Sequence, residues 1–158
     1  MKKRSEKTKI FIGSDHTGFA LKQEIKKFLA SQGYLAEDIG SYKYNKTDDY
    51  PDYALKVCRA VLKAKTESKG ILICGTGQGM SIAANKFPGI RAALCWNKET
   101  AVHASEHLNS NVLCLGDISL QLAKQLVVAW LETLFLSKEK RHIRRINKIK
   151  AIEKRYSK

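Results

Sequence analysis

Residues 70–86 constrain the possible fold of this chain more than any other stretch. The segment begins with four apolar residues at positions 71–74, a pattern typical of a strand buried on both faces of a parallel sheet. Alternating glycines and hydroxyl residues follow, and residues 81–86 have helix-forming composition. A glycine-rich turn between a buried strand and a helix presents backbone N–H groups at the positive end of the helix dipole. The segment therefore predicts an anion-binding turn.

Cys74 ends the predicted strand and so lies next to the predicted anion site. A helix N-terminus and nearby cations both favour the thiolate, which makes Cys74 a candidate nucleophile or base. The alternative interpretation is a buried structural cysteine at a tight turn.

The glycine spacing argues against a nucleotide site. Gly75, Gly77 and Gly79 alternate and Met80 follows, so the turn does not match the dinucleotide pattern G-x-G-x-x-G. Glu99 lies at a suitable distance for a ribose-binding acid, but it does not follow a predicted strand. The chain also contains no G-x-x-x-x-G-K-[ST] motif.

Strand and helix patterns alternate along the whole chain. Five β-α units in this order predict a doubly wound, Rossmann-like parallel sheet of five strands with helices on both faces. The strands are expected at residues 9–13, 34–39, 71–74, 90–95 and 112–115. The helices are expected at residues 19–32, 52–66, from residue 80, 98–107 and 119–135, with a C-terminal basic helix at 137–158. Residues 1–158 are expected to form a single domain, with a disordered basic start at residues 1–8.

The formal net charge of +14 is concentrated at the two ends of the chain. An anionic substrate, nucleic acid or solubility alone would each account for it. Four isoleucines recur every third residue in the basic helix, so it is expected to pack on another surface. The 119–135 helix also has more apolar surface than one sheet face can cover, which predicts a contact with a second chain.

The cysteines and the apolar segments indicate the cellular compartment in which the protein is expected. The four cysteines include no C-x-x-C pair, which indicates neither a disulfide framework nor a zinc site. No signal peptide or membrane-length apolar stretch is present. A cytoplasmic protein without a membrane partner is therefore expected.

Ligands of doubly wound folds bind outside the carboxyl ends of the strands. Asp15, His16 and the turn after Cys74 fall there. Acid–base groups around backbone donors suit proton removal beside a carbonyl group, because the donors stabilise the enediolate that forms. His103 and His107 lack an H-E-x-x-H pattern, so no metal is expected. His107 precedes a strand and so lies at the opposite edge of its own unit, which predicts that it reaches the cleft across a subunit interface.

Three motifs make the sequence similar to a known family. Residues 12–19 (IGSDHTGF), 49–54 (DYPDYA) and 74–86 (CGTGQGMSIAANK) resemble the type B ribose-5-phosphate isomerase family, which also contains allose-6-phosphate and galactose-6-phosphate isomerases. The resemblance extends over residues 9–155. It implies a Rossmann-like enzyme without metal or cofactor, which forms a homodimer or tetramer with active sites shared between subunits.

The resemblance also implies roles for individual residues. Cys74 matches the catalytic base and His107 the residue that opens the sugar ring. Asp15 and His16 match the pair that contacts the sugar and its phosphate. The anion loop, which includes a catalytic Thr76, comprises Gly75, Thr76, Gly77, Gln78 and Gly79. The phosphate-binding arginines are matched by Arg141 and Arg145, whose i, i+4 spacing independently places both guanidinium groups on one helix face.

Two positions depart from the family pattern. Leu108 follows His107 where the family usually has Asn, and residues 117–119 lack the Arg that the family usually has there. The expected function is the interconversion of ribose 5-phosphate and ribulose 5-phosphate through an enediolate, in the pentose phosphate pathway. Two alternatives stay open. One is an isomerase of allose or galactose 6-phosphate; the other is a degenerate family member that binds a phosphosugar or, less favoured, nucleic acid.

Overall fold

The computed structural model describes residues 8–157 and contains one five-stranded sheet. The strands are β1 (Lys9–Ser14), β2 (Ala36–Gly40), β3 (Ser68–Ile73), β4 (Ala92–Leu94) and β5 (Val112–Leu115). They lie in the order β2-β1-β3-β5-β4, and all neighbouring pairs are parallel. This arrangement confirms the predicted α/β fold with a five-stranded parallel sheet.

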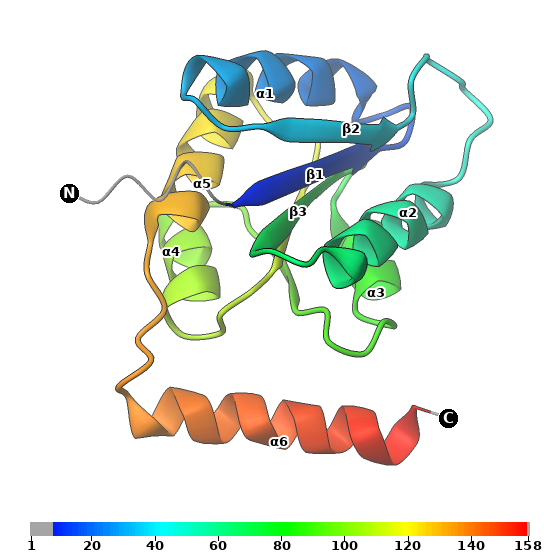
Figure 1. Ribbon diagram of the computed structural model, residues 1–158. Coiled ribbons are helices and arrows are strands. Elements are labelled where there is room, and N and C mark those ends of the chain that lie inside the picture. The colour runs from blue at the N-terminus through cyan, green and yellow to red at the C-terminus, as the bar shows by residue number, and fades with distance from the viewer. Residues whose placement is uncertain (1–7, 158) are drawn as a thin grey trace.

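Helices cover both faces of the sheet. Side chains of α1 (Phe19–Ser31), α4 (Lys98–Glu106) and α5 (Leu120–Glu132) pack on one face. Side chains of α2 (Tyr50–Lys63) and α3 (Gln78–Ala84) pack on the other. The sixth helix, α6 (Lys140–Tyr156), runs along one end of the molecule, outside the two layers (Figure 1).

Strand β3 is buried on both faces, as its unbroken apolar pattern predicts. Ile71 and Ile73 contribute to the core beneath α1, α4 and α5, whereas Leu72 and Cys74 contribute to the core beneath α2 and α3. Since alternate residues of a strand point to opposite faces, a strand in this position needs apolar residues throughout.

The β1–β3 pair determines where a ligand can bind. From β1 the chain goes to β2 on one side of β1, and it then returns to β3 on the other side of β1. The strand order therefore reverses between β1 and β3, which makes this the topological switch point of the sheet. Ser14 pairs with Ile73 at the carboxyl ends of the two strands. The turns that begin at Asp15 and Cys74 therefore start side by side.

Several element boundaries differ from those expected. The 119–135 helix ends at Glu132, because Thr133 takes an extended backbone conformation (φ −73°, ψ 126°). The fourth strand is limited to Ala92–Leu94, and α6 begins at Lys140 instead of residue 137. Residues 1–7 of the expected disordered start lie outside the described residues, whereas Thr8 is buried.

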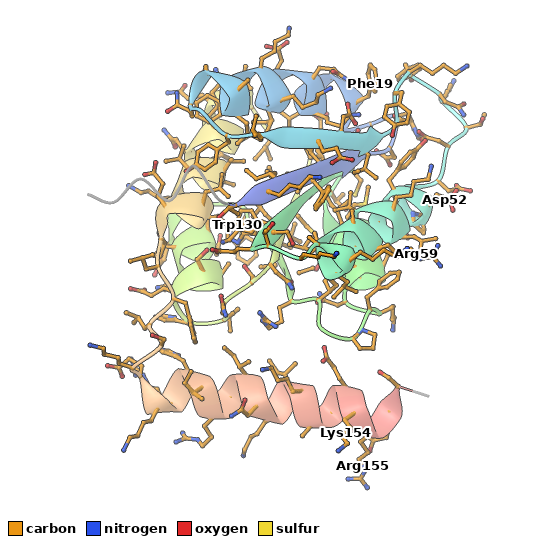
Figure 2. The ribbon with its side chains drawn as sticks, viewed as in Figure 1. Phe19, Asp52, Arg59, Trp130, Lys154 and Arg155 are labelled. Atoms are coloured by element: carbon orange, nitrogen blue, oxygen red, sulfur yellow. The ribbon has the colours of Figure 1, made fainter. Side chains whose placement is uncertain are left out.

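Much of the apolar surface of the 119–135 segment is covered within the one chain, although Leu134 is 64% exposed. Its large apolar residues Leu126, Val127, Trp130 and Leu131 are buried within the one chain. Trp130 is completely buried, and its indole Nε1 donates a hydrogen bond of 2.7 Å to Ser110 Oγ (Figure 2). One sheet face, together with α1 and α4, therefore covers these four side chains, whereas Leu120 and Leu122 are only partly buried.

The helices within residues 8–157 do not combine the length and hydropathy that a membrane crossing requires.

Candidate active site

The turn after β3 holds the thiol of Cys74 against backbone donors. The Cys74 side chain is almost fully buried, and the N–H of Gly77 donates a hydrogen bond of 3.2 Å to its Sγ atom. Gly77 is in the left-handed region (φ 74°), and a Cβ atom there would lie 2.6 Å from Leu94 Cδ1. Only glycine meets both requirements, so the sequence motif secures the donor that faces the thiol.

The backbone donors of this turn are divided between two tasks. The N–H of Gly77 faces Cys74, and the N–H of Gln78 donates to Thr76 Oγ1 at 3.3 Å. These two donors therefore organise the turn itself. Gly79 allows the ring of Tyr50 to approach, since a Cβ atom at Gly79 would lie 2.6 Å from Tyr50 Cζ.

Asp15 is buried at the end of β1, where it holds the turn that leads into α1. Its Oδ1 atom accepts hydrogen bonds from Thr17 N (3.0 Å), Thr17 Oγ1 (2.6 Å) and Gly18 N (3.1 Å). A carboxylate oxygen used in this way stabilises the start of the helix. The structure thus supports a turn-forming role for this oxygen of Asp15.

His16 is held by Asp48, a residue that the sequence analysis missed. Asp48 Oδ1 lies 2.9 Å from the His16 backbone N–H and 2.7 Å from His16 Nδ1. Burial acts to raise the pKa of the Asp48 carboxyl, but hydrogen bonds from His16 and Tyr53 together outweigh it and hold that pKa below its usual range. With Nδ1 engaged, the Nε2 atom is the one left to meet a ligand.

An aromatic cluster lies beside this pair. The rings of Tyr44 and His16 meet edge to face with their centroids 6.2 Å apart, and the rings of Tyr44 and Phe19, at the start of α1, do so at 6.5 Å. Tyr44 and Asp48 both belong to the segment between β2 and α2. This segment therefore borders the carboxyl end of β1, although its sequence carries no strand or helix pattern.

His107 belongs to a second group of residues, apart from the first group around Cys74, Asp15 and His16. It follows α4 directly and precedes β5, so it lies at the edge where the strands begin, opposite Cys74. Its ring stacks on His142 of α6 at 4.4 Å between centroids and on His103 at 4.5 Å. As expected from the order of the elements, a single chain does not bring His107 to Cys74.

Arg141 and Arg145 share the second group. Both are exposed on α6, and Arg141 Nε lies 3.9 Å from Glu139 Oε2. Burial, followed by the positive charges of His107, Arg141 and Arg145, lowers the pKa of His142. Arg141 directly precedes His142 in α6, and His142 stacks on His107, so this end of α6 passes His107.

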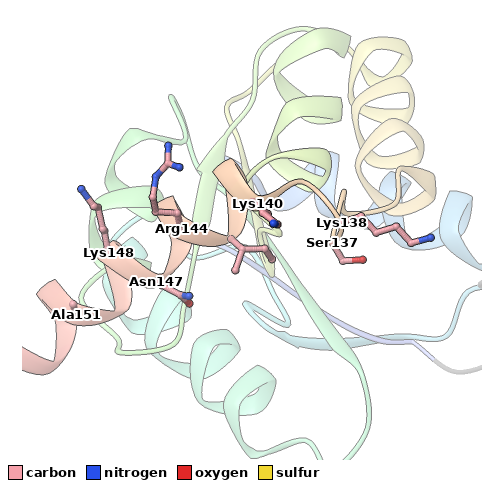
Figure 3. A pocket seen from close by; sticks show the side chains of 8 residues that line it. Ser137, Lys138, Lys140, Arg144, Asn147, Lys148 and Ala151 are labelled. Atoms are coloured by element: carbon pink, nitrogen blue, oxygen red, sulfur yellow. The ribbon is translucent and has the colours of Figure 1, made fainter.

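A groove of about 530 Å³ runs along α6 and the segment before it (Figure 3). Its lining combines an apolar strip with cationic side chains, and comprises Ser137, Lys138, Lys140, Ile143, Arg144, Asn147, Lys148 and Ala151. All of these residues come from one end of the chain. The groove is therefore a feature of the α6 surface and not of the turn at Cys74.

The two departures from the family pattern lie in different places. Leu108 is exposed beside His107, and its carbonyl oxygen accepts a hydrogen bond of 3.1 Å from Arg91 Nε. Asp117 lies against the glycine turn, where its N–H donates to Gly75 O at 3.0 Å. One departure therefore belongs to each of the two groups of residues.

Comparison with known proteins gives one consistent result. A family model described as Ribose/Galactose Isomerase matches residues 10–149. The chain is 45% identical to "Ribose-5-phosphate isomerase B" of Escherichia coli over 93% of its own length and 97% of that protein. A solved structure of the Clostridium thermocellum ribose-5-phosphate isomerase B is 49% identical, covers 94% of this chain and 99% of its own, and superposes with a TM-score of 0.88. That of the Mycoplasma genitalium enzyme with bound ribulose 5-phosphate is 42% identical, covers 93% and 97%, and has a TM-score of 0.88.

Proposed function

The chain belongs to the ribose/galactose isomerase family, among the type B ribose-5-phosphate isomerases, and we propose that it interconverts ribose 5-phosphate and ribulose 5-phosphate at sites shared by two copies. The observation that carries this proposal is Cys74, which is buried at the β1–β3 switch point with a backbone donor on its sulfur. The four free cysteines suit a reducing compartment, so we place the reaction in the cytoplasm.

The Cys74 thiolate acts as the base in this mechanism. It removes the proton from C2 of the open-chain aldose and returns it to C1, while a proton moves from the C2 hydroxyl to the C1 oxygen. The intermediate is an enediolate, whose negative oxygen needs fixed donors. Thr76 and the backbone N–H groups of the turn that are not used internally supply them.

His107 opens the furanose ring before this step by transferring a proton between the anomeric hydroxyl and the ring oxygen. It approaches the reacting atoms from the second copy. Its position at the edge where the strands begin supports this arrangement, because Cys74 follows β3 at the opposite edge.

The phosphate is held by groups from both copies. His16, oriented by Asp48, contacts it from the copy that contributes Cys74, where Asp15 shapes the adjoining turn. Arg141 and Arg145 contact it from the copy that contributes His107, and their spacing suits a phosphate clamp. Fixing the phosphate in this way brings C1 and C2 to the thiol.

Exposed apolar residues support the assembly of two or more chains. Ile149 and Ile152 of α6 are 40% and 59% exposed, although Ile146, about one turn before Ile149, is buried. Ile82 and Trp96 are more than 60% exposed near the carboxyl ends of β3 and β4. A homodimer covers such residues, and a tetramer is a pair of these dimers.

An assay with three substrates in parallel tests the activity. Ribose 5-phosphate, allose 6-phosphate and galactose 6-phosphate are each incubated with the wild-type protein and with Cys74→Ala. We expect turnover of ribose 5-phosphate that depends on Cys74. Faster turnover of a six-carbon substrate would contradict the proposal and assign Leu108 and Asp117 to a changed specificity. Binding of the sugar phosphates without turnover would also contradict it.

A further inference from the structure

Three imidazole rings and one carboxylate gather where α4 ends and α6 passes. His103, His107 and His142 form a continuous stack, with centroids 4.5 Å and 4.4 Å apart. Glu106 joins them, since its Oε2 atom lies 3.2 Å from His107 Nε2. The proposed reaction uses only His107 of these four residues.

His103, Glu106 and His107 are arranged as metal ligands. One ligand atom from each lies within 4.8 Å of the other two. The three residues occupy positions i, i+3 and i+4, which share one face of a helix. A tetrahedral Zn²⁺ site with bonds of 2.0–2.2 Å requires ligand atoms about 3.3 Å apart. The His103 side chain is exposed, so closing this gap requires its ring to leave the stack on His107.

The charges around the cluster both favour and oppose a cation. The C-terminal end of α4 presents the negative end of its dipole to this position, and Glu106 adds a negative charge. Arg141 and Arg145 oppose it, because their charges reach His142. Uncharged imidazole nitrogens are ligands that transition metals accept in such surroundings, whereas Ca²⁺ and Mg²⁺ require oxygen.

His142 forms the buried end of the imidazole stack. Its side chain is 97% buried (3% exposed), and its Nε2 atom has no hydrogen-bond partner among residues 8–157. Buried polar atoms are normally satisfied, which makes His142 Nε2 an exception beside the two other imidazoles.

We propose that His103, Glu106 and His107 bind a divalent transition-metal ion of the Zn²⁺ type at the end of α4. The missing H-E-x-x-H pattern had predicted that no metal binds here. The present pattern instead places the carboxylate and the second histidine next to each other at the last turn of the helix.

Metal binding has a consequence that rests on the proposed function. His107 is the residue that opens the sugar ring, and a metal on its imidazole removes that nitrogen from the reaction. Zn²⁺ is therefore an inhibitor of the isomerase that acts at the His107 side of the shared site, away from the Cys74 thiol.

Calorimetric titration with ZnCl₂ tests the site without reference to activity. We expect one ion per chain in the wild-type protein, and at least about a tenfold loss of affinity in both His103→Gln and Glu106→Gln, since each loses one ligand. Glu99→Gln, an exposed glutamate in the first turn of the same helix, is the matched control and keeps the wild-type affinity. Unchanged affinity in both ligand variants would overturn the proposal.

Titration with Co²⁺ separates this site from binding at cysteine, because thiolate–cobalt complexes have a charge-transfer band in the near ultraviolet that imidazole complexes lack. We expect no such band, and Cys74→Ala keeps the wild-type affinity. A thiolate band that disappears in Cys74→Ala would place the metal on the sulfur and refute the site.

Inhibition is measured separately. His103→Gln keeps the basal turnover of ribose 5-phosphate and is at least about tenfold less sensitive to Zn²⁺ than the wild type. Stoichiometric binding without inhibition would leave the metal site standing and contradict the proposed role of His107. Equal inhibition of wild type and His103→Gln would refute the inhibitory role of the site.

Discussion

The backbone N–H of Gly77 points at the Sγ atom of Cys74 across 3.2 Å. A donor hydrogen bond to sulfur stabilises the thiolate more than the thiol. Within residues 8–157, no backbone N–H donates to the sulfur of the other three cysteines. Burial raises the pKa of Cys58 to about 12 and that of Cys95 to about 11, and it also raises the pKa of Cys114. Cys74 is thus the cysteine whose surroundings suit a base.

Replacing Cys74 by Ala should lower the turnover of ribose 5-phosphate by about 10²–10⁴-fold, the usual effect of removing a general base. Steady-state kinetics measure the loss, and circular dichroism checks the fold. Cys95→Ala, a change at another buried cysteine, should keep the activity. A Cys74→Ala variant with more than about a tenth of the wild-type rate would place the base elsewhere.

Asp48→Asn should raise KM for ribose 5-phosphate about 10–100-fold and change kcat much less. The substitution keeps an acceptor for His16 but removes the charge, and hydrogen bonds to charged groups contribute about 1.5–3 kcal/mol. Asp52→Asn, on the exposed first turn of α2, is the control and should leave both constants unchanged (Figure 2). A kcat effect with constant KM would show that Asp48 acts on the chemical step and not through phosphate binding.

Subunit mixing tests the shared site. Cys74→Ala and His107→Ala are each expected to be inactive, but refolding them together should restore activity. Random pairing in a two-fold dimer places both wild-type residues in about a quarter of the sites, and the recovered activity should approach that fraction. Sedimentation analysis provides the second measurement, and a fully active monomer would refute the arrangement.

Asp38→Asn should destabilise the protein by about 3–5 kcal/mol, because it leaves the fully buried Lys22 without its counter-charge. Asp38 accepts hydrogen bonds from Lys22 at 2.7 Å and Lys26 at 2.6 Å. Urea unfolding measures the effect. Glu37→Gln breaks a half-exposed ion pair with Lys9 and should change stability by no more than about 1 kcal/mol. Equal losses of stability in Asp38→Asn and Glu37→Gln would contradict the stabilising role of the buried Lys22–Asp38 pair.

Acid should remove the contribution of Asp38 selectively. Burial acts to raise its pKa, but Lys22, Lys26 and Gly40 N–H outweigh burial and hold the pKa below its usual range. A lowered carboxyl pKa adds stability that is complete above the unfolded value of about 3.9 and is lost as the pH falls further. The stability difference between wild type and Asp38→Asn should thus be constant from pH 5 to 7 and shrink below about pH 4. A difference independent of pH would exclude the charge as its cause.

Local sequence was enough to predict the fold class and the glycine turn that follows Cys74. Residues 71–74 are apolar without interruption because β3 is buried on both faces, and the glycines after them allow a backbone that other residues do not adopt. The order of the elements also placed His107 opposite Cys74, since parallel strands separate the residues that follow strands from those that precede them.

Contacts between segments that are distant in sequence were visible only in the tertiary structure. Asp48 lies 32 positions from His16 in a stretch without periodicity, so no local pattern indicated that pair. The stack of His103, His107 and His142 likewise exists only because α6 passes the end of α4. Periodicity reports which face of an element is apolar, but which elements meet depends on the packing of the whole chain.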